Sequence, residues 1–318
     1  MLTNRTLPTA LQPADTVAVV APAGRVDPEA LERGVETLRA RGLRVKVGRH
    51  VLDAYGHMAG ADRDRASDLM AAFLDPEVHG VFCARGGSGS ARMLPYLDLR
   101  EIATNPKVFV GYSDVTVLHL ALGRSAGWPT FYGPMVATDA ECCRDDDCFA
   151  ALWRLISRPE PAGALQFDDG PRSARVLIAG AAEGMLTGGT LCLVESSLGA
   201  SYQARTEGRL LALEDTNETP WRVDRMLTHL GHAGLLEQAA GFIIGSLSNL
   251  ETDSSDDLSV EQSLLDHLGP FGKPVLYGFP FGHIAAPLTL PLNCRARVDA
   301  DAETLTVLEA AVAPRSRA

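Results

Sequence analysis

The sequence predicts an α/β protein whose main sheet is built from parallel strands. Short apolar runs, such as residues 16–21 and 108–110, have the length and the β-branched content of buried strands. Segments with apolar residues at helical spacing, such as residues 27–41 and 62–74, alternate with these runs. This alternation favours a parallel sheet covered by helices on both faces.

The first half of the chain contains the clearest strand–helix units. Between its first two strands, Asp27 can cap a helix that has Pro28 at its first position and closes at Gly42. In sheets of this kind ligands bind beyond the carboxyl ends of the strands, so a site is expected in the turns that follow them. The expected strands of this half are residues 16–21, 44–47, 80–84 and 108–110.

A change in composition separates the second half of the chain from the first. Residues 159–171 contain several prolines and glycines, which indicates a connector. We therefore expect a first domain over residues 1–158, a linker over 159–174 and a second domain over 175–318. This second domain should contain strands at 175–178, 210–213, 241–245 and 275–277, helices at 188–198, 221–230 and 259–268, and a β-hairpin within 289–308.

The composition argues against nucleic-acid and membrane partners. The 318 residues include 29 Lys and Arg against 40 Asp and Glu, a net charge of -11, and the basic residues are scattered. A phosphate-binding surface needs clustered basic side chains. The longest apolar runs are strand-length, and residues 1–8 lack the apolar core of a signal peptide. A cytoplasmic protein is therefore expected.

The six cysteines fit that expectation. Cys83 and Cys192 lie in apolar runs and are expected to be small buried side chains. Cys142, Cys143 and Cys148 lie in an acidic segment where a metal site is conceivable, but no Cys-x-x-Cys pair with a matching His occurs. We expect a solvated loop with free thiols there, and neither a metal nor a cofactor.

A sharp strand-to-helix turn contains the first candidate catalytic residue. Between the strand at 108–110 and the next helix the chain has only Gly111, Tyr112 and Ser113. A serine on such a turn presents its hydroxyl at the edge of the sheet, and the backbone N–H of Asp114 then opens a helix, where it can stabilise an oxyanion. The alternative is that Ser113 and Asp114 only cap the helix.

A glycine-rich turn, residues 85–90, follows the preceding strand. It is neither a Gly-x-Gly-x-x-Gly sequence nor a Walker A sequence, so a phosphate cradle has little support. Gly86 and Gly87 would let the backbone approach a substrate and would offer a second N–H beside that of Asp114. The alternative is a tight turn that requires positive φ.

A serine nucleophile needs a base, and the base needs an acceptor to orient it. Among eight histidines, His283 differs because it follows a strand within a stiff, partly apolar loop of Gly, Pro and Phe. A satisfied loop histidine is the alternative. His119, on the helix after the serine turn, is expected to point away from it. For the acceptor, Glu214 at the end of a strand fits best, with Asp215 and Glu218 as alternatives.

Five motifs together resemble one known family. They occur in the order seen in LD-carboxypeptidases, the serine peptidases of family S66 that are also called muramoyltetrapeptide carboxypeptidases, and they extend from about residue 16 to 308. Two positions depart from the family pattern: Ser88 stands where an aromatic residue is common, and Thr190 stands where an Asn is common. Neither change removes a residue that the resemblance assigns to catalysis. The motifs are Arg85-Gly86-Gly87-x-Gly89, Gly111-Tyr112-Ser113-Asp114, Leu213-Glu214-Asp215, Arg225-Met226-Leu227 and Pro280-Phe281-Gly282-His283.

The resemblance implies a fold and a triad. The family fold is a flavodoxin-like N-terminal domain with a parallel sheet plus a smaller, β-rich α/β C-terminal domain, usually in a dimer. Ser113 is then the nucleophile, His283 the general base and acid, and Glu214 the residue that orients His283. The oxyanion hole would be the N–H of Asp114 and an N–H of the Gly86-Gly87 turn.

The resemblance also implies a reaction. It is hydrolysis of the L,D-peptide bond before the terminal D-alanine of cytoplasmic murein tetrapeptides, in peptidoglycan recycling, through an acyl-enzyme on Ser113 and without a metal. One alternative is a peptidase of the microcin C immunity type, which cleaves a peptidyl-nucleotide. The other alternative is a non-catalytic small-molecule binding module.

Overall fold

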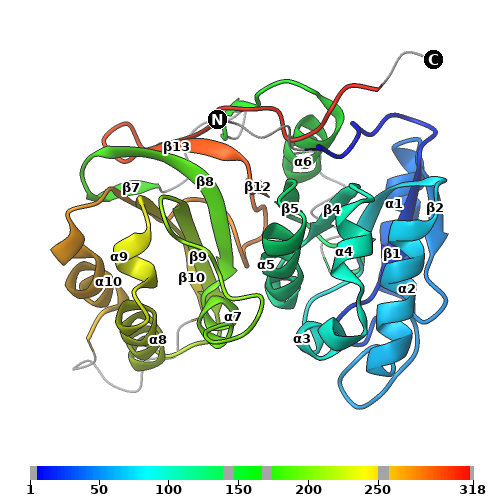
Figure 1. The fold of residues 1–318 in the computed structure, drawn as a ribbon, viewed down its shortest axis with the longest axis horizontal. Helices are drawn as coiled ribbons and strands as arrows, with labels where there is room; N and C mark the ends of the chain where they lie inside the picture. The colour runs from blue at the N-terminus through cyan, green and yellow to red at the C-terminus, as the bar shows by residue number, and fades with distance from the viewer. Residues whose placement is uncertain (1–5, 139–146, 167–173, 250–257, 316–318) are drawn as a thin grey trace. The chain divides into compact units, whose positions relative to one another are not determined.

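The computed structural model describes residues 6–138, 147–166, 174–249 and 258–315 (Figure 1). The chain divides into two compact units. The first contains Met1–Pro161, Thr289–Asn293 and Ala310–Ala318, and the second contains Ala162–Leu288 and Cys294–Glu309. The chain thus leaves the first unit and returns to it twice near its C-terminus.

The first unit is organised around a six-stranded sheet with the order β12-β5-β4-β3-β1-β2. The parallel sheet predicted from the sequence is confirmed, because all its neighbouring strands pair parallel except β12, which is antiparallel to β5. The strands are β1 (Thr16–Val20), β2 (Arg44–Val47), β3 (Val78–Cys83), β4 (Val108–Gly111), β5 (Thr130–Tyr132) and β12 (Leu290–Leu292).

The helices of the first unit follow the local signals in the sequence. Asp27 caps α1 as predicted, since its Oδ1 accepts a hydrogen bond from the N–H of Ala30 at 2.8 Å. The helix after the serine turn, α5, ends at Ser125, and a Cβ on Gly123 would come within 2.8 Å of the side chain of Asn293. The elements are α1 (Pro28–Ala40), α2 (Asp62–Leu74), α3 (Ser90–Met93), η1 (Leu94–Tyr96), α4 (Leu99–Ala103), η2 (Ser113–Val115), α5 (Thr116–Ser125) and α6 (Asp147–Ser157).

The second unit contains an eight-stranded mixed sheet with the order β6-β14-β13-β8-β9-β10-β11-β7. The four strands from β8 to β11 pair parallel, and the outer pairs are antiparallel. The predicted hairpin near the C-terminus is confirmed as β13 and β14. The strands are β6 (Gly163–Ala164), β7 (Arg175–Ile178), β8 (Ala181–Thr190), β9 (Leu210–Thr216), β10 (Gly241–Ser248), β11 (Val275–Tyr277), β13 (Arg295–Asp299) and β14 (Thr304–Val307).

The helices of the second unit gather around α8, which contacts α7, α9 and α10 (Figure 1). The helix predicted to open at Gly188 begins later, because Gly188 and Gly189 belong to β8. A Cβ on Gly188 would overlap the carbonyl oxygen of Ala212, so β8 and β9 are too close there for a larger residue. The elements are α7 (Leu191–Ser196), α8 (Pro220–His232), α9 (Leu235–Gln238), α10 (Val260–Leu268) and η3 (Gly269–Phe271).

The cysteines only partly follow the expectation. Cys83 is buried and free, and Cys192 is free but half-buried. Cys142 and Cys143 lie outside the described residues. Cys148 is buried in α6 and is disulfide-bonded, so the prediction of a free thiol is wrong for this residue. No helix in the described part of the chain combines the length and the apolar character needed to cross a membrane.

Gly34 on the buried face of α1 shows how closely the first unit is packed. A Cβ at this position would overlap the carbonyl group of Val136, which is backbone and cannot rotate away. The helix therefore approaches the segment after β5 more closely than any side chain would allow.

We predict that Gly34→Ala lowers the free energy of unfolding by about 2 kcal/mol or more, because the added methyl group forces the helix outward. Urea unfolding monitored by circular dichroism measures this loss. The matched control is Gly231→Ala in α8, where a Cβ meets nothing closer than 3.7 Å. The control should be neutral or stabilising by up to about 1 kcal/mol. Equal effects in the two variants would contradict the packing argument.

Candidate active site

The turn after β4 holds Ser113 in an unusual backbone conformation. Tyr112 is extended, and Ser113 has φ +63°, a left-handed value that a serine rarely adopts. The 3₁₀ turn η2 and then α5 follow directly. A strained serine between a parallel strand and a helix is the geometry of a nucleophile elbow, which exposes the hydroxyl at the carboxyl end of the sheet.

The side chains of Tyr132 and His119 form hydrogen bonds with the backbone of this turn. The backbone N–H of Ser113 donates to the hydroxyl of Tyr132 at 3.3 Å. Contrary to the expectation, His119 does not point away from the turn: its Nε2 lies 2.8 Å from the carbonyl oxygen of Gly111. Its Nδ1 lies 2.8 Å from Oγ1 of Thr130. Since a carbonyl only accepts, Nε2 carries the proton and the threonine hydroxyl donates to Nδ1.

Burial keeps this histidine uncharged. His119 is fully enclosed, and desolvation lowers its pKa from 6.5 to about 4. The unfolded chain therefore binds a proton between pH 6.5 and 4 that the folded chain does not. The resulting contribution to stability is complete above pH 6.5 and is lost as the pH falls toward 4.

We predict that His119→Gln removes this part of the pH dependence. Between pH 6.5 and 4 the neutral His119 contributes on the order of 3 kcal/mol to the pH dependence of stability. The difference in unfolding free energy between wild type and variant should therefore shrink as the pH falls. Urea unfolding at pH 7 and pH 4.5 measures the difference. Parallel curves for the two proteins would contradict a neutral His119.

The glycine-rich turn after β3 lies directly against the serine. A Cβ on Gly86 would come within 2.7 Å of the Cβ of Ser113 and 2.9 Å of its Oγ. Gly87 has φ +113°, and the N–H of Gly24 donates to the carbonyl of Gly86 at 2.9 Å. Close backbone approach and positive φ, the two reasons considered for these glycines, therefore both apply.

The side chain of Asp114 links the two turns. Its buried Oδ2 accepts a hydrogen bond from the N–H of Ser90 at 2.7 Å, and burial raises its pKa above the usual value. The buried guanidinium of Arg65 donates to the carbonyl of Gly89 at 3.0 Å and pairs with Asp62. No feature of the sequence singles out Arg65, because it lies within an ordinary amphipathic helix pattern.

In the second unit, the predicted acid and base lie in contact. The carboxylate of Glu214 is fully buried, and its Oε2 lies 2.7 Å from Nδ1 of His283 and 3.1 Å from the backbone nitrogen of the same residue. Because the carboxylate accepts from Nδ1–H, the Nε2 atom of His283 keeps its lone pair. The imidazole, half-buried, is thus oriented as a general base.

The competing carboxylates are used elsewhere. Asp215 accepts from the N–H of Cys192 at 2.8 Å and from that of Thr216 at 2.9 Å, and burial raises its pKa to about 6. Glu218 pairs with Arg222 at 2.9 Å. The prediction that β9 ends before Glu214 is wrong, because the strand continues to Thr216 and both acids lie within it.

The loop that carries His283 is stiff, as expected. Phe281 is fully buried, and its carbonyl accepts from the N–H of Ser246 at 3.1 Å. Gly282 has φ +98°, and a Cβ there would overlap the carboxylate of Glu214. The imidazole and the carboxylate can pair this closely only because position 282 has no side chain.

We predict that Gly282→Ala separates His283 from Glu214 and lowers kcat at least about tenfold, since the base loses its orientation. The matched control is Gly272→Ala, which also has positive φ (+60°) but whose Cβ would meet no described residue within 4 Å. That variant carries the backbone strain without the clash. Similar losses of peptidase activity in both would show that strain alone is responsible.

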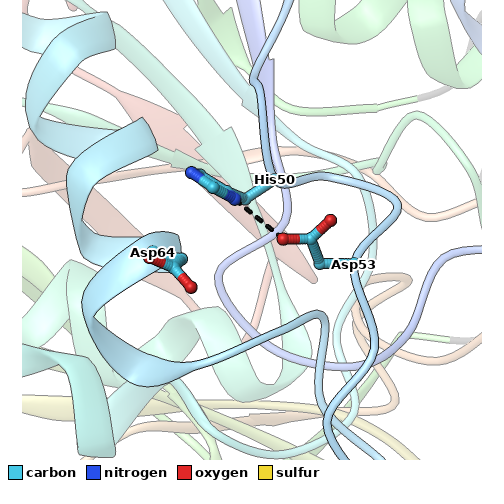
Figure 2. A group of neighbouring side chains, drawn as sticks. All are labelled: His50, Asp53 and Asp64. Carbon is cyan, nitrogen blue, oxygen red and sulfur yellow. Dashed lines mark hydrogen bonds and ion pairs between the residues drawn. The ribbon is translucent and has the colours of Figure 1, made fainter.

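Three side chains of the kinds that bind metal ions, His50, Asp53 and Asp64, lie together in the first unit, outside both turns. Nδ1 of His50 lies 2.7 Å from a carboxylate oxygen of Asp53. Figure 2 shows this contact, with Asp64 nearby on α2. The hydrogen bond to Asp53 raises the pKa of His50, as expected for an exposed ion pair. Within the described residues, this group and Cys192 with Asp215 and Glu218 each bring three ligand-type atoms within 4.8 Å of one another.

The two halves of the chain match the two domains of one enzyme family. The LD-carboxypeptidase N-terminal domain matches residues 17–133, and the LD-carboxypeptidase C-terminal domain matches residues 183–298. The chain belongs to the LD-carboxypeptidase family. It is therefore a serine-type carboxypeptidase, a hydrolase, and not the non-catalytic binding module considered from the sequence.

Several carboxypeptidases are similar to this chain over nearly its whole length. A probable murein peptide carboxypeptidase of Bacillus subtilis is 37% identical over 96% of this chain and 95% of its own length. A putative carboxypeptidase of Streptomyces coelicolor is 39% identical over 94% and 95%. The crystal structure of a muramoyltetrapeptide carboxypeptidase from Oxalobacter formigenes matches with TM-score 0.80 and 29% identity, over 94% of this chain and all of that chain.

A more distant structure shares the fold alone. The microcin C7 self-immunity protein matches with TM-score 0.85 over 96% of this chain and 99% of that chain, at 22% identity. The fold predicted from the sequence, a parallel-sheet domain joined to a β-rich α/β domain, is thus confirmed.

Proposed function

We propose that this carboxypeptidase hydrolyses the L,D-peptide bond before the terminal D-alanine of murein tetrapeptides, through an acyl-enzyme on Ser113. The observation that carries the proposal is the buried Glu214–His283 pair, which leaves Nε2 of the imidazole ready to accept a proton. The strained backbone of Ser113 supports it independently. The murein substrate is taken from the name of the Bacillus subtilis relative.

The proposed reaction begins when Oγ of Ser113 attacks the carbonyl carbon of the L-centre that precedes D-alanine. Nε2 of His283 accepts the hydroxyl proton, and Glu214 stabilises the imidazolium that forms. When the tetrahedral intermediate collapses, His283 gives this proton to the departing amino group of D-alanine. A water molecule then attacks the acyl carbon and gives a proton to Nε2 of His283. The ester bond to Oγ of Ser113 breaks, His283 returns this proton to Oγ, and the shortened peptide leaves with a new carboxylate. The mechanism requires Ser113 and His283, from different units, to meet during turnover.

The oxyanion in this mechanism would accept hydrogen bonds from the N–H of Asp114 and an N–H of the Gly86-Gly87 turn. Gly87 is favoured, because the carbonyl of Gly86 is held by Gly24 and this fixes the plane of the peptide group that contains the N–H of Gly87. Asp114 is fixed in turn by its bond to Ser90. Both donors would thus be in place before substrate arrives.

The proposal includes a homodimer in the cytoplasm, where recovered murein peptides would be the substrate, with no metal, cofactor or nucleic acid. A peptidyl-nucleotide is the second candidate substrate. One observation favours it: Trp221 at the start of α8 is 52% exposed, as an aromatic that stacks on a base would be. The guanidinium of Arg225 already lies 5.0 Å from the centre of that ring, which reduces the space for a base.

We predict that Ser113→Ala lowers release of D-alanine from a murein tetrapeptide at least about a thousandfold, because the nucleophile is lost, while the unfolding curve stays unchanged. Chromatographic detection of free D-alanine measures this. The control is Ser67→Ala, which removes an exposed serine hydroxyl on α2. Full activity of Ser113→Ala would end the proposal.

The same assay distinguishes the two substrates. Wild-type protein is supplied with the tetrapeptide and, in parallel, with a peptidyl-adenylate at equal concentration. A higher kcat/KM for the tetrapeptide supports the murein assignment. Turnover of the peptidyl-adenylate alone, abolished by Ser113→Ala, would keep the mechanism and replace the substrate.

A further inference from the structure

The hydroxyl of Thr190 does not do what its position in the chain suggests. Thr190 ends β8 and is the N-cap residue of α7, where a threonine normally accepts a hydrogen bond from the first turn of the helix. Its side chain makes no such bond. Thr190 as a residue is only 4% exposed, and its hydroxyl instead donates to Oε1 of Glu214 at 3.0 Å.

Asp215, the residue after Glu214, accepts a hydrogen bond from the first turn of α7 instead of Thr190. Asp215 accepts the N–H of Cys192, the second residue of α7, at 2.8 Å, and its other oxygen accepts the N–H of Thr216. The N–H of Cys192 in the first turn of α7 is therefore satisfied by a side chain of β9 rather than by the N-cap residue of the helix. The threonine hydroxyl instead donates to the carboxylate that orients His283.

The register of the sheet makes this arrangement possible. Thr190 and Glu214 are direct partners in the parallel pairing of β8 with β9. A Cβ on Gly188, two residues earlier, would overlap the backbone of Ala212, so the two strands approach closely at this end. This close pairing brings the hydroxyl of Thr190 within hydrogen-bond distance of the Glu214 carboxylate.

The hydrogen bond divides the two oxygens of the carboxylate between two tasks. Oε1 accepts from Thr190, while Oε2 accepts from Nδ1–H and the backbone N–H of His283. A buried carboxylate held at both oxygens cannot turn about its last side-chain torsion. A carboxylate held only at Oε2 could turn, and the imidazole would turn with it.

We propose that Thr190 is a positioning residue, which locks the carboxylate of Glu214 and thereby orients His283, while Asp215 accepts the N–H of Cys192 in the first turn of α7. The proposal rests on the proposed function in that its effect on rate passes through His283. The contact itself does not depend on which substrate is cleaved.

The kinetic test compares an isosteric change that removes the hydroxyl with a smaller side chain that keeps it. Thr190→Val keeps the shape and removes the donor, so kcat falls about tenfold to a hundredfold with KM nearly unchanged. Thr190→Ser keeps the donor and restores kcat to within about threefold of wild type. The control is Thr206→Val, another buried threonine of the second unit, whose hydroxyl has no hydrogen-bond partner among the described residues. Equal kcat in Thr190→Val and wild type would overturn the proposal.

A double-mutant cycle tests whether the effect passes through the acid. In a Glu214→Ala background, Thr190→Val should lower the residual rate no more than about twofold, because the partner of the hydroxyl is already gone. A loss as large as that in the wild-type background would overturn the proposal and indicate a structural role in α7. Thermal unfolding of each variant shows whether a loss of rate accompanies a loss of stability.

A measurement without turnover keeps this inference separate from the proposed function. The Nδ1 proton of His283 is followed by NMR in Ser113→Ala protein with and without Thr190→Val. We expect its resonance to shift or broaden with Val and to stay in place with Ser. An unchanged resonance would overturn the positioning role, even if Ser113 proves essential. A full rate in Ser113→Ala would instead end the proposed function, whatever this resonance does.

Discussion

The contact between the buried carboxylate of Glu214 and the ring of His283 is the interaction on which the chemistry of the second unit depends. An ionised carboxylate without solvent is costly unless its oxygens receive hydrogen bonds. β8 supplies one donor through Thr190, and the loop after β11 supplies two through His283. The stiff loop, the absent side chain at Gly282 and the capping of α7 by Asp215 all serve this one arrangement.

The first unit solves a different problem, because it must hold a serine in a conformation that serines avoid. The strain at Ser113 persists because the surrounding groups are fixed: Tyr132 binds its N–H, and His119 binds the strand just before it. Asp114 ties the same turn to the glycine-rich turn through Ser90. These groups belong to β5, α5 and α3, so a short turn is held by elements from all around it.

Local signals in the sequence predicted local structure well, and failed where distant segments decide the outcome. The cap at Asp27 depends on residue types that are visible in the sequence. The contact between Glu214 and His283 joins segments 69 residues apart. For it the residues alone left Asp215 and Glu218 open, and only the family resemblance selected Glu214. The end of β9 was misplaced, because two consecutive acids are unexpected inside a buried strand. The direction of His119 was also wrong, since the partner of Nε2 depends on how α5 packs against β4. No local pattern contains that information.

The pairing of β12 with β5 has a consequence for biosynthesis. The edge strand of the nucleophile-bearing sheet comes from residues 290–292, so this sheet stays incomplete while most of the polypeptide leaves the ribosome. Until then, β5 presents unpaired backbone groups to neighbouring chains. Cutting the gene after Pro161 would leave that edge permanently open. The two units are therefore poor candidates for separate expression, and a truncated chain would tend to aggregate.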